Sequence, residues 1–346
     1  MKTNKRINSK TKQLLYFFAA GLIIISLLSF SSCTGLDNSS LRDPLKVQSS
    51  ESNISHNKTD NNKNTKAQTD NAKKAVQEQN QLISKPVLVP DSKFICGLQD
   101  VDYEMLVSTR FDVAIVDPDD SELSKEDIIS LHSQDKILIA YLSIGEAENY
   151  RNYWQKDWKP GNPVFLDKEN PTWKGNFKVK YWHSDWQKIV FDSLFKIIDK
   201  GYDGVYLDIV DAYDYFDDKG YADTRLHMVN FVMAISKYAK NQNRDFLIVP
   251  QNSEELIVEN GYLNAIDGVG RESLWFLCDS LQDKDELAIS LGYLNQIIET
   301  GKFVFAINYC QKEENIENFI TLAQKYGFIP YIGPRELDSI EDAVNE

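Results

Sequence analysis

Eight short apolar runs recur between residues 94 and 333, and several are followed by a segment with helical periodicity. The runs are FICGL (94–98), DVAIVD (112–117), ILIAYLSIGE (137–146), GVYLD (204–208), FLIVPQN (246–252), GVGRESL (268–274), FVFAINY (303–309) and IPYIG (329–333). Continuous apolar strands that alternate with helices predict a parallel sheet covered on its faces. Eight such repeats in about 250 residues favour a closed (β/α)8 TIM barrel over an open doubly wound sheet. No GxGxxG follows the first run, which argues further against a dinucleotide-binding fold.

The helical pattern is clear in QKIVFDSLFKIIDKG, where Val190, Leu194 and Ile197 share one face. Gly201 stands where a glycine commonly ends a helix. The same arrangement recurs before Gly301 and before Gly327. These three segments are therefore predicted to be helices of the barrel.

The first 33 residues have the layout of an export signal. Five Lys/Arg and no acid precede an apolar run and small residues. Ser31-Ser32-Cys33 resembles the bacterial lipoprotein box, although Phe30 stands where that pattern prefers an aliphatic residue. Residues 1–33 are thus predicted to be a signal peptide that leaves Cys33 acylated and the protein attached to a membrane. An uncleaved anchor and a secreted protein are the alternatives, and each places the rest of the chain outside the cytoplasm.

Residues 34–90 contain mainly Asn, Lys, Ser, Thr, Asp and Gln. Such a segment buries too little apolar surface to offset its ordering entropy, so it is predicted to be a flexible polar linker. Residues 91–346 then form the barrel domain.

The formal net charge of −14 argues against a nucleic-acid partner and is compatible with a cationic ligand. With four His and no CxxC pair, the chain offers no zinc site, and no cofactor is expected. Besides Cys33 the chain has Cys96, Cys278 and Cys310. A Cys278–Cys310 disulfide and free buried thiols are both open.

The long connection 150–186 holds five of the six Trp, among them Trp182. A long connection in a barrel is usually functional, and aromatic rings suit the apolar faces of sugars. Most of these Trp are expected to pack the loop onto the barrel, and one or two are expected to meet a ligand.

Polar side chains collect where the predicted strands end, which is where a barrel has its active site. They include Asp117, Glu146, Asp208, Asn252 and Glu272. By strand alternation Asp208 shares a side with Tyr206, and we expect that side to face the barrel axis. Asp211 lies just beyond this strand. A group of carboxylates without His or Cys indicates either glycoside hydrolysis by two carboxyl groups or a divalent-metal site of oxygen ligands.

The motifs YLSIGEAENYRNYW, WKGNFKVKYWHSDWQ, GYDGVYLDIVD, VPQNSEEL and GRESL resemble glycoside hydrolase family 114 over nearly all of 94–335. The resemblance implies an extracellular barrel of the endo-α-1,4-polygalactosaminidase type. It places the catalytic pair on Asp208 as nucleophile and Glu272 as acid/base of a retaining mechanism. The expected contacts to sugar hydroxyls or amines come from Asp117, Tyr141, Glu146, Trp182, Asp211, Asn252 and Tyr309. The alternative is a carbohydrate-binding lipoprotein that keeps the barrel without turnover.

Overall fold

The structure is a computed structural model that describes residues 88–340. The predicted signal peptide, with Cys33, and the predicted linker up to residue 87 lie outside the described residues, so both stay predictions. No helix within 88–340 has the length and apolar character that a membrane span requires.

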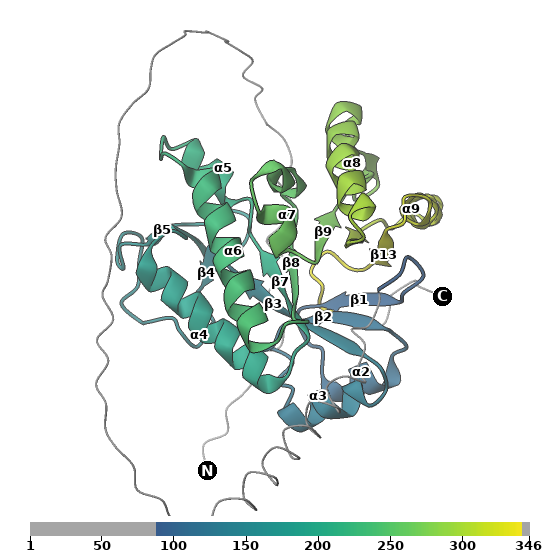
Figure 1. Ribbon diagram of the computed structural model, residues 1–346, viewed down its shortest axis with the longest axis horizontal. Helices are drawn as coiled ribbons and strands as arrows, with labels where there is room; N and C mark the ends of the chain where they lie inside the picture. Colours follow the sequence, from purple (N-terminus) through teal and green to yellow (C-terminus); the bar gives the residue numbers. More distant parts are fainter. Residues whose placement is uncertain (1–87, 341–346) are drawn as a thin grey trace, which may run out of the picture. The chain divides into compact units, whose positions relative to one another are not determined.

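Eight parallel strands form the centre of the described region (Figure 1). They are β1 (Phe94–Gly97), β2 (Val113–Val116), β3 (Ile137–Ser143), β7 (Gly204–Asp208), β8 (Leu247–Pro250), β9 (Gly268–Glu272), β12 (Phe303–Asn308) and β13 (Ile329–Ile332). Each lies within one of the eight predicted runs, which confirms the predicted strands. They pair in the order β1-β2-β3-β7-β8 in one sheet and β9-β12-β13 in a second.

The two sheets meet at both ends of this order. Gln251 forms a parallel bridge with Gly270, and the Asn252 backbone N–H donates to the Gly270 carbonyl at 2.7 Å. At the other end, the Phe94 ring stacks on Phe305 with centroids 4.1 Å apart and contacts Tyr331 at 5.5 Å. Aromatic side chains of β1, β12 and β13 therefore form a shared core.

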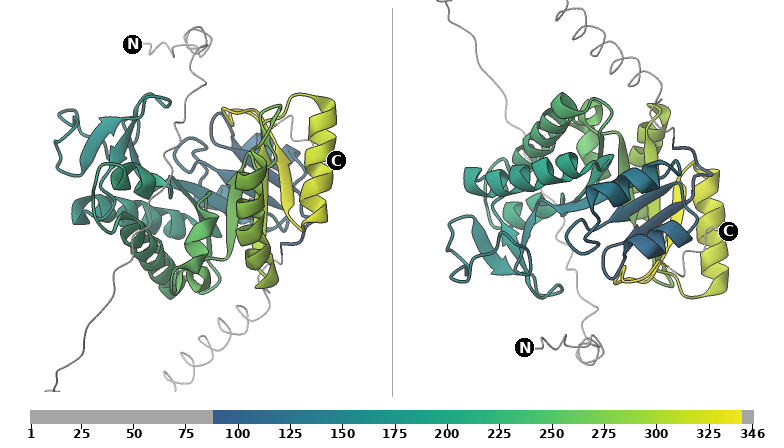
Figure 2. Two further views of the ribbon diagram at one scale, coloured as in Figure 1. Left: turned by 90° about the horizontal axis from the view of Figure 1, so that it is seen from above. Right: turned by 90° about the horizontal axis from the view of Figure 1, so that it is seen from below.

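Helices lie around the outside of the strands (Figures 1 and 2). They are α2 (Tyr103–Ser108), α3 (Lys125–His132), α4 (Ser184–Lys200), α5 (Ala212–Asp217), α6 (Thr224–Gln242), the 3-10 helix η2 (Glu254–Val258), α7 (Tyr262–Ala265), α8 (Lys284–Glu299) and α9 (Glu313–Lys325). The predicted helix before Gly201 is α4, which ends at a left-handed Gly201 (φ 104°). The two predicted helices before Gly301 and Gly327 are α8 and α9.

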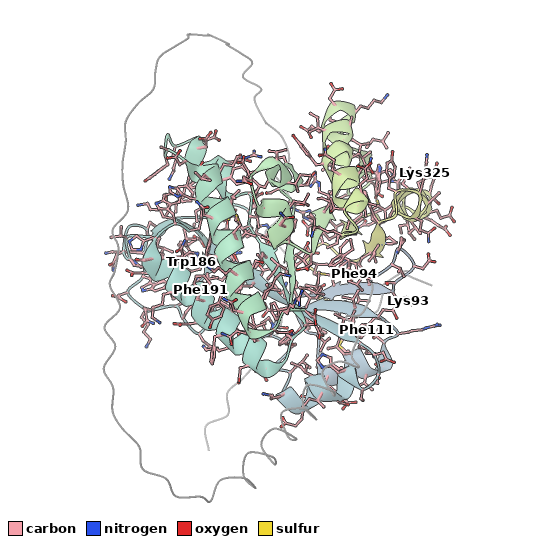
Figure 3. All side chains as sticks on the ribbon, in the orientation of Figure 1. Lys93, Phe94, Phe111, Trp186, Phe191 and Lys325 are labelled. Carbon is pink, nitrogen blue, oxygen red and sulfur yellow. The ribbon has the colours of Figure 1, made fainter. Side chains whose placement is uncertain are left out.

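Helix α4 shows how the outer layer is attached (Figure 3). Trp186 is buried, and its indole N–H donates to the Ile144 carbonyl at 2.8 Å. Phe191, farther along α4, contacts Phe231 and Tyr238 of α6. Helix α4 thus packs on the strand layer with one side chain and on its neighbouring helix with another.

The prediction was wrong about the segment after β3. That strand ends at Ser143, and residue 146 begins the separate strand β4 (Glu146–Glu148). Strand β4 pairs with β6 (Asn176–Val179), and β6 pairs with β5 (Leu166–Glu169), in an antiparallel sheet of order β4-β6-β5. The Trp-rich connection predicted as one long loop therefore contains a hairpin. A smaller hairpin of β10 (Phe276–Leu277) and β11 (Ser280–Leu281) follows β9.

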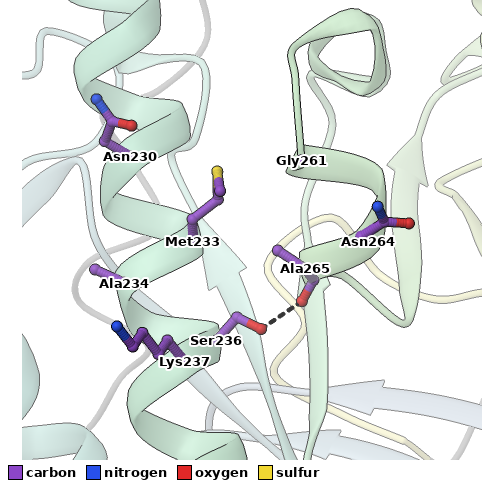
Figure 4. Close-up of a pocket in the computed structure, with 8 residues that line it drawn as sticks. All are labelled: Asn230, Met233, Ala234, Ser236, Lys237, Gly261, Asn264 and Ala265. Carbon is purple, nitrogen blue, oxygen red and sulfur yellow. Dashed lines mark hydrogen bonds between the residues drawn. The ribbon is translucent and has the colours of Figure 1, made fainter.

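A groove between α6 and α7 opens on the helical layer (Figure 4). It is lined by Asn230, Met233, Ala234, Ser236, Lys237, Gly261, Asn264 and Ala265. The Ser236 hydroxyl spans the two helices by donating to the Ala265 carbonyl at 2.6 Å. Lys237 is the one ionisable side chain in this lining, and neither predicted catalytic residue belongs to it.

Candidate active site

The two predicted catalytic carboxyls end two parallel strands. Asp208 is the last residue of β7, and Glu272 is the last residue of β9. Tyr206, two residues before Asp208, packs so closely on Gly270 that a Cβ there would overlap the Tyr206 ring. This contact joins β7 and β9 on the side that carries Asp208, because residues two apart on a strand share a side. The structure thus brings both carboxyls to one edge.

Asp208 accepts two hydrogen bonds. The Tyr141 hydroxyl donates to Oδ2 at 2.6 Å, and the Ile209 backbone N–H donates to Oδ1 at 2.8 Å. Burial raises the pKa of Asp208 to about 8, against the opposing effect of the Tyr141 hydrogen bond, and the negative charge of Glu272 adds to the rise. The coupling of the two carboxyls is typical of an acid/base pair.

Glu272 is positioned from both neighbouring strands. The Tyr309 hydroxyl, just after β12, donates to Oε1 at 2.6 Å. The Asn252 side-chain oxygen, just after β8, accepts from the Glu272 backbone N–H at 3.1 Å. Arg271 points the other way, toward Glu254 at 3.1 Å and Ser290 at 3.2 Å. The Arg271 and Glu272 side chains therefore leave β9 on opposite sides.

A chain of polar contacts leads away from Asp208 through Tyr141. The Tyr141 hydroxyl also lies 3.3 Å from Glu148 Oε1, and Glu148 Oε2 accepts from Arg151 Nε at 2.6 Å. Both Arg151 terminal nitrogens donate to Asp117, at 2.7 and 2.6 Å. Burial raises the pKa of Glu148, and the Arg151 charge opposes that rise. The sequence analysis missed Glu148 and Arg151; their available signal was the polar pair inside the aromatic stretch YLSIGEAENYRNYW.

Three residues predicted to contact substrate have other roles in the structure. Asp117 is buried, and its carboxylate is occupied by Arg151 and by backbone N–H groups. Glu146 is fully buried, with Oε1 bound by Lys178 at 2.6 Å and by Asn170 at 2.9 Å. Trp182 packs against aromatic rings of Tyr181, Phe216, Tyr221 and His227. Asp117 and Glu146 are thus buried in ion pairs and Trp182 is packed among aromatic rings, and their contact with substrate stays a prediction.

The remaining predicted site residues differ in their contacts with Asp208 and Glu272. Tyr141, Asn252 and Tyr309 all lie within hydrogen-bond distance of Asp208 or Glu272 groups. Asp211 is exposed at the N-cap of α5, where its side chain makes no capping bond. Within 88–340 no group of three or more His, Cys, Asp or Glu side chains is arranged to hold a metal ion.

The cysteines are free thiols in the described chain. Cys96 is buried, and burial with the charges of Glu272 and Asp208 raises its pKa. Cys278 and Cys310 are not bonded to each other, although the Cys310 thiol donates to the Cys278 carbonyl at 3.0 Å.

The raised pKa of Asp208 predicts a pH-dependent stability gain for Asp208→Asn. A carboxyl whose folded-state pKa lies above its unfolded value of about 3.9 loses stability as the pH rises between the two values. Asn does not ionise and, like the protonated carboxyl, offers one acceptor oxygen and one donor group. The variant should exceed the wild type in thermal midpoint by about 10 °C at pH 8 and match it near pH 4.

Thermal unfolding followed by circular dichroism from pH 4 to pH 8 measures this difference. Asp245→Asn, on an exposed loop, is the matched control and should show no such trend. A difference between Asp208→Asn and the wild type that does not grow with pH would contradict the prediction.

The chain has relatives of similar length. It is 37% identical over 265 residues to an uncharacterised protein of Methanocaldococcus jannaschii, which covers 70% of this chain and 76% of the relative. It is 39% identical over 239 residues to one of Deinococcus radiodurans, which covers 67% and 76%.

Two solved structures share the fold. Ega3 of Aspergillus fumigatus, crystallised with galactosamine, matches with a TM-score of 0.60 at 20% identity over 74% of this chain and 96% of that one. The glycoside hydrolase domain of PelA from Pseudomonas aeruginosa matches with a TM-score of 0.56 at 17% identity, over 73% and 98%. The model of glycoside-hydrolase family GH114 matches residues 66–346. The chain therefore belongs to family GH114 and is a glycoside hydrolase.

Proposed function

We propose that this glycoside hydrolase cleaves an amino-sugar polysaccharide of the α-1,4-galactosaminan type, with Asp208 as nucleophile and Glu272 as acid/base. The observation that carries the proposal is the pair of strand-end carboxyls, each held by a tyrosine hydroxyl at 2.6 Å. The eight strands then form a closed (β/α)8 barrel, in which aromatic side chains join β1 to β13. The galactosamine bound by Ega3 and the net charge of −14 support a cationic sugar.

The chemistry proceeds in two steps. An Asp208 oxygen attacks the anomeric carbon while the glycosidic C–O bond breaks, and Glu272 gives its proton to the leaving oxygen. Glu272 then takes a proton from water, whose oxygen attacks the same carbon and releases Asp208. The Tyr309 hydroxyl suits both states of Glu272, because a hydroxyl can donate to a carboxylate and accept from a carboxylic acid.

The sugar charge bears on the ionisation of Asp208. With a pKa of about 8, this carboxyl holds a proton in much of the free enzyme at neutral pH, whereas a nucleophile must be ionised. A nearby ammonium group favours the ionised form. A cationic sugar would thus bind at the site and also activate Asp208.

Replacing either carboxyl should abolish cleavage without abolishing binding. On partially de-N-acetylated galactosaminogalactan, Glu272→Gln should lower the rate of new reducing ends by about 10²–10⁴-fold, and Asp208→Asn at least as much. NMR of the first product should show the α anomer, as retention requires. A wild-type protein that binds the polymer but releases no more ends than Asp208→Asn would instead be the non-catalytic carbohydrate-binding lipoprotein.

Tyr141→Phe should move the pH profile. The Tyr141 hydroxyl favours ionised Asp208, so its loss should shift the rising limb of kcat/KM upward by about one pH unit. Tyr150→Phe is the matched control, because that hydroxyl donates to Glu148 at 2.7 Å and not to Asp208. An unshifted limb in Tyr141→Phe, or an equal shift in both variants, would contradict the assignment of Asp208.

We further propose that the enzyme is exported and anchored through acylated Cys33, supported by the charge and apolar pattern of residues 1–33. Cys33→Ser should leave the protein unlabelled by radioactive palmitate in a bacterial host, and wild type should be labelled and membrane-bound. Equal labelling of both, or none of either, would contradict lipidation.

A further inference from the structure

Arg335 lies between two aromatic rings at the mouth of the site. Its guanidinium carbon is 5.9 Å from the Trp173 ring centre and 5.6 Å from the Tyr309 ring centre, within the range of cation–π contact. Trp173 belongs to the turn between β5 and β6, and Arg335 follows β13. The turn between β5 and β6 and the segment after β13, which are far apart in sequence, therefore contact each other through Arg335.

Trp173 is the one tryptophan of the Trp-rich connection that is exposed, with 43% of its surface accessible. Its turn is anchored from below: Asn170 accepts from the Trp173 backbone N–H at 3.4 Å and donates to buried Glu146 at 2.9 Å. An exposed ring on an anchored turn offers a flat apolar face, which is the surface that the C–H face of a sugar needs.

The cluster of Trp173, Arg335 and Tyr309 contacts Glu272 through Tyr309, whose hydroxyl donates to Glu272 at 2.6 Å. The charged side chain next to Asp208 is negative, whereas Arg335 is positive. Asp211 is exposed three residues beyond Asp208, and its charge is among those that raise the Asp208 pKa. Arg151 also lies against Tyr141, but it is buried and paired with Asp117 and Glu148. The exposed charges therefore differ: an acid lies beside Asp208 and a guanidinium near Glu272.

We propose that Trp173, Tyr309 and Arg335 form a sugar subsite on the leaving-group side of the scissile bond, and that it takes an uncharged sugar. This rests on the proposed function, in which Glu272 protonates the leaving oxygen. An ammonium sugar would meet the like charge of Arg335 and lose binding energy. An N-acetylated sugar carries no charge, and its carbonyl can accept from the guanidinium. The enzyme then cuts between an ammonium sugar on the Asp208 side and an uncharged sugar on the Arg335 side.

Product sequencing tests the subsite. Partially N-acetylated α-1,4-galactosamine oligomers are cleaved in H₂¹⁸O, which marks the new reducing ends, and mass spectrometry identifies the sugar at each new non-reducing end. Wild type should give mainly N-acetylated new non-reducing ends. Arg335→Gln should lose this bias and cleave fully de-acetylated oligomers with about five-fold higher kcat/KM. Trp173→Ala should raise KM about three- to ten-fold for both substrates.

Arg244→Gln is the matched control, because it removes the same charge from an exposed loop before β8, away from the strand ends that carry Asp208 and Glu272. It should behave as wild type. The subsite proposal would be overturned if wild type gave N-acetylated new non-reducing ends only in proportion to the oligomer composition. It would also be overturned if Arg335→Gln and Arg244→Gln had equal effects.

A binding measurement makes the test independent of turnover. The Trp173 indole NMR signal, assigned with Trp173→Phe, is followed during titration with N-acetylgalactosamine and with galactosamine at pH 6. The acetylated sugar should bind more tightly to wild type, and Arg335→Gln should reduce that difference about five-fold. Equal affinity of wild type for both sugars would overturn the proposal, even if cleavage occurs. Absence of cleavage with the predicted binding difference would instead refute only the catalytic assignment.

Discussion

The Arg151 guanidinium is the central contact among the polar side chains that lie next to Tyr141 and Asp208. It pairs with Asp117 at the end of β2 and with Glu148 on β4, and the three side chains are at most 8% exposed. A buried charge set of this kind is costly to disrupt, since removing one member leaves another charge buried without a partner. Glu148 also contacts the Tyr141 hydroxyl, so this guanidinium is linked through one carboxylate to the group that donates to Asp208. It also ties the β4-β6-β5 sheet, with its Trp173 turn, to the parallel strands.

The approach of Asp208 and Glu272 depends on parallel strand geometry more than on any local motif. Residues 208 and 272 are 64 positions apart, yet each ends a strand of the same direction, so both side chains reach one edge. Gly270 permits this approach, because any side chain there would overlap Tyr206. The close packing behind the carboxyls leaves little room for water, and burial is accordingly the largest cause of the raised Asp208 pKa.

The sequence analysis could predict the strands, and the polar residues at their ends, because both follow from repetition; the pairing of Asp208 with Glu272 came from the family resemblance and stays a prediction. Apolar runs mark the strands, and a barrel places their ends together. Glu146 was wrongly placed at a strand end because the chain turns at Gly145, which lies against the Ile209 carbonyl too closely for a side chain. That contact spans 64 residues and has no local signature. For Arg151 the same limit applies to its pairing with Asp117, 34 residues before it, whereas its pairing with Glu148, three residues before it, is local.

Asp208 and Glu272 each accept a hydrogen bond from a tyrosine hydroxyl. The charged groups that surround these two tyrosines differ. Next to Tyr141 lie the anion Glu148 and the buried Arg151, whose guanidinium is 5.7 Å from the Tyr141 ring centre and is neutralised by Glu148 and Asp117. Behind Tyr309 lies the cation Arg335, packed on the tyrosine ring. Paired titratable groups take separate roles when their surroundings differ in this way. An anionic surrounding favours a positive sugar beside Asp208, and a cationic one disfavours it beside Glu272. The proposed roles of Asp208 and Glu272 and the proposed charge preference for substrate therefore depend on the groups around the same two tyrosines.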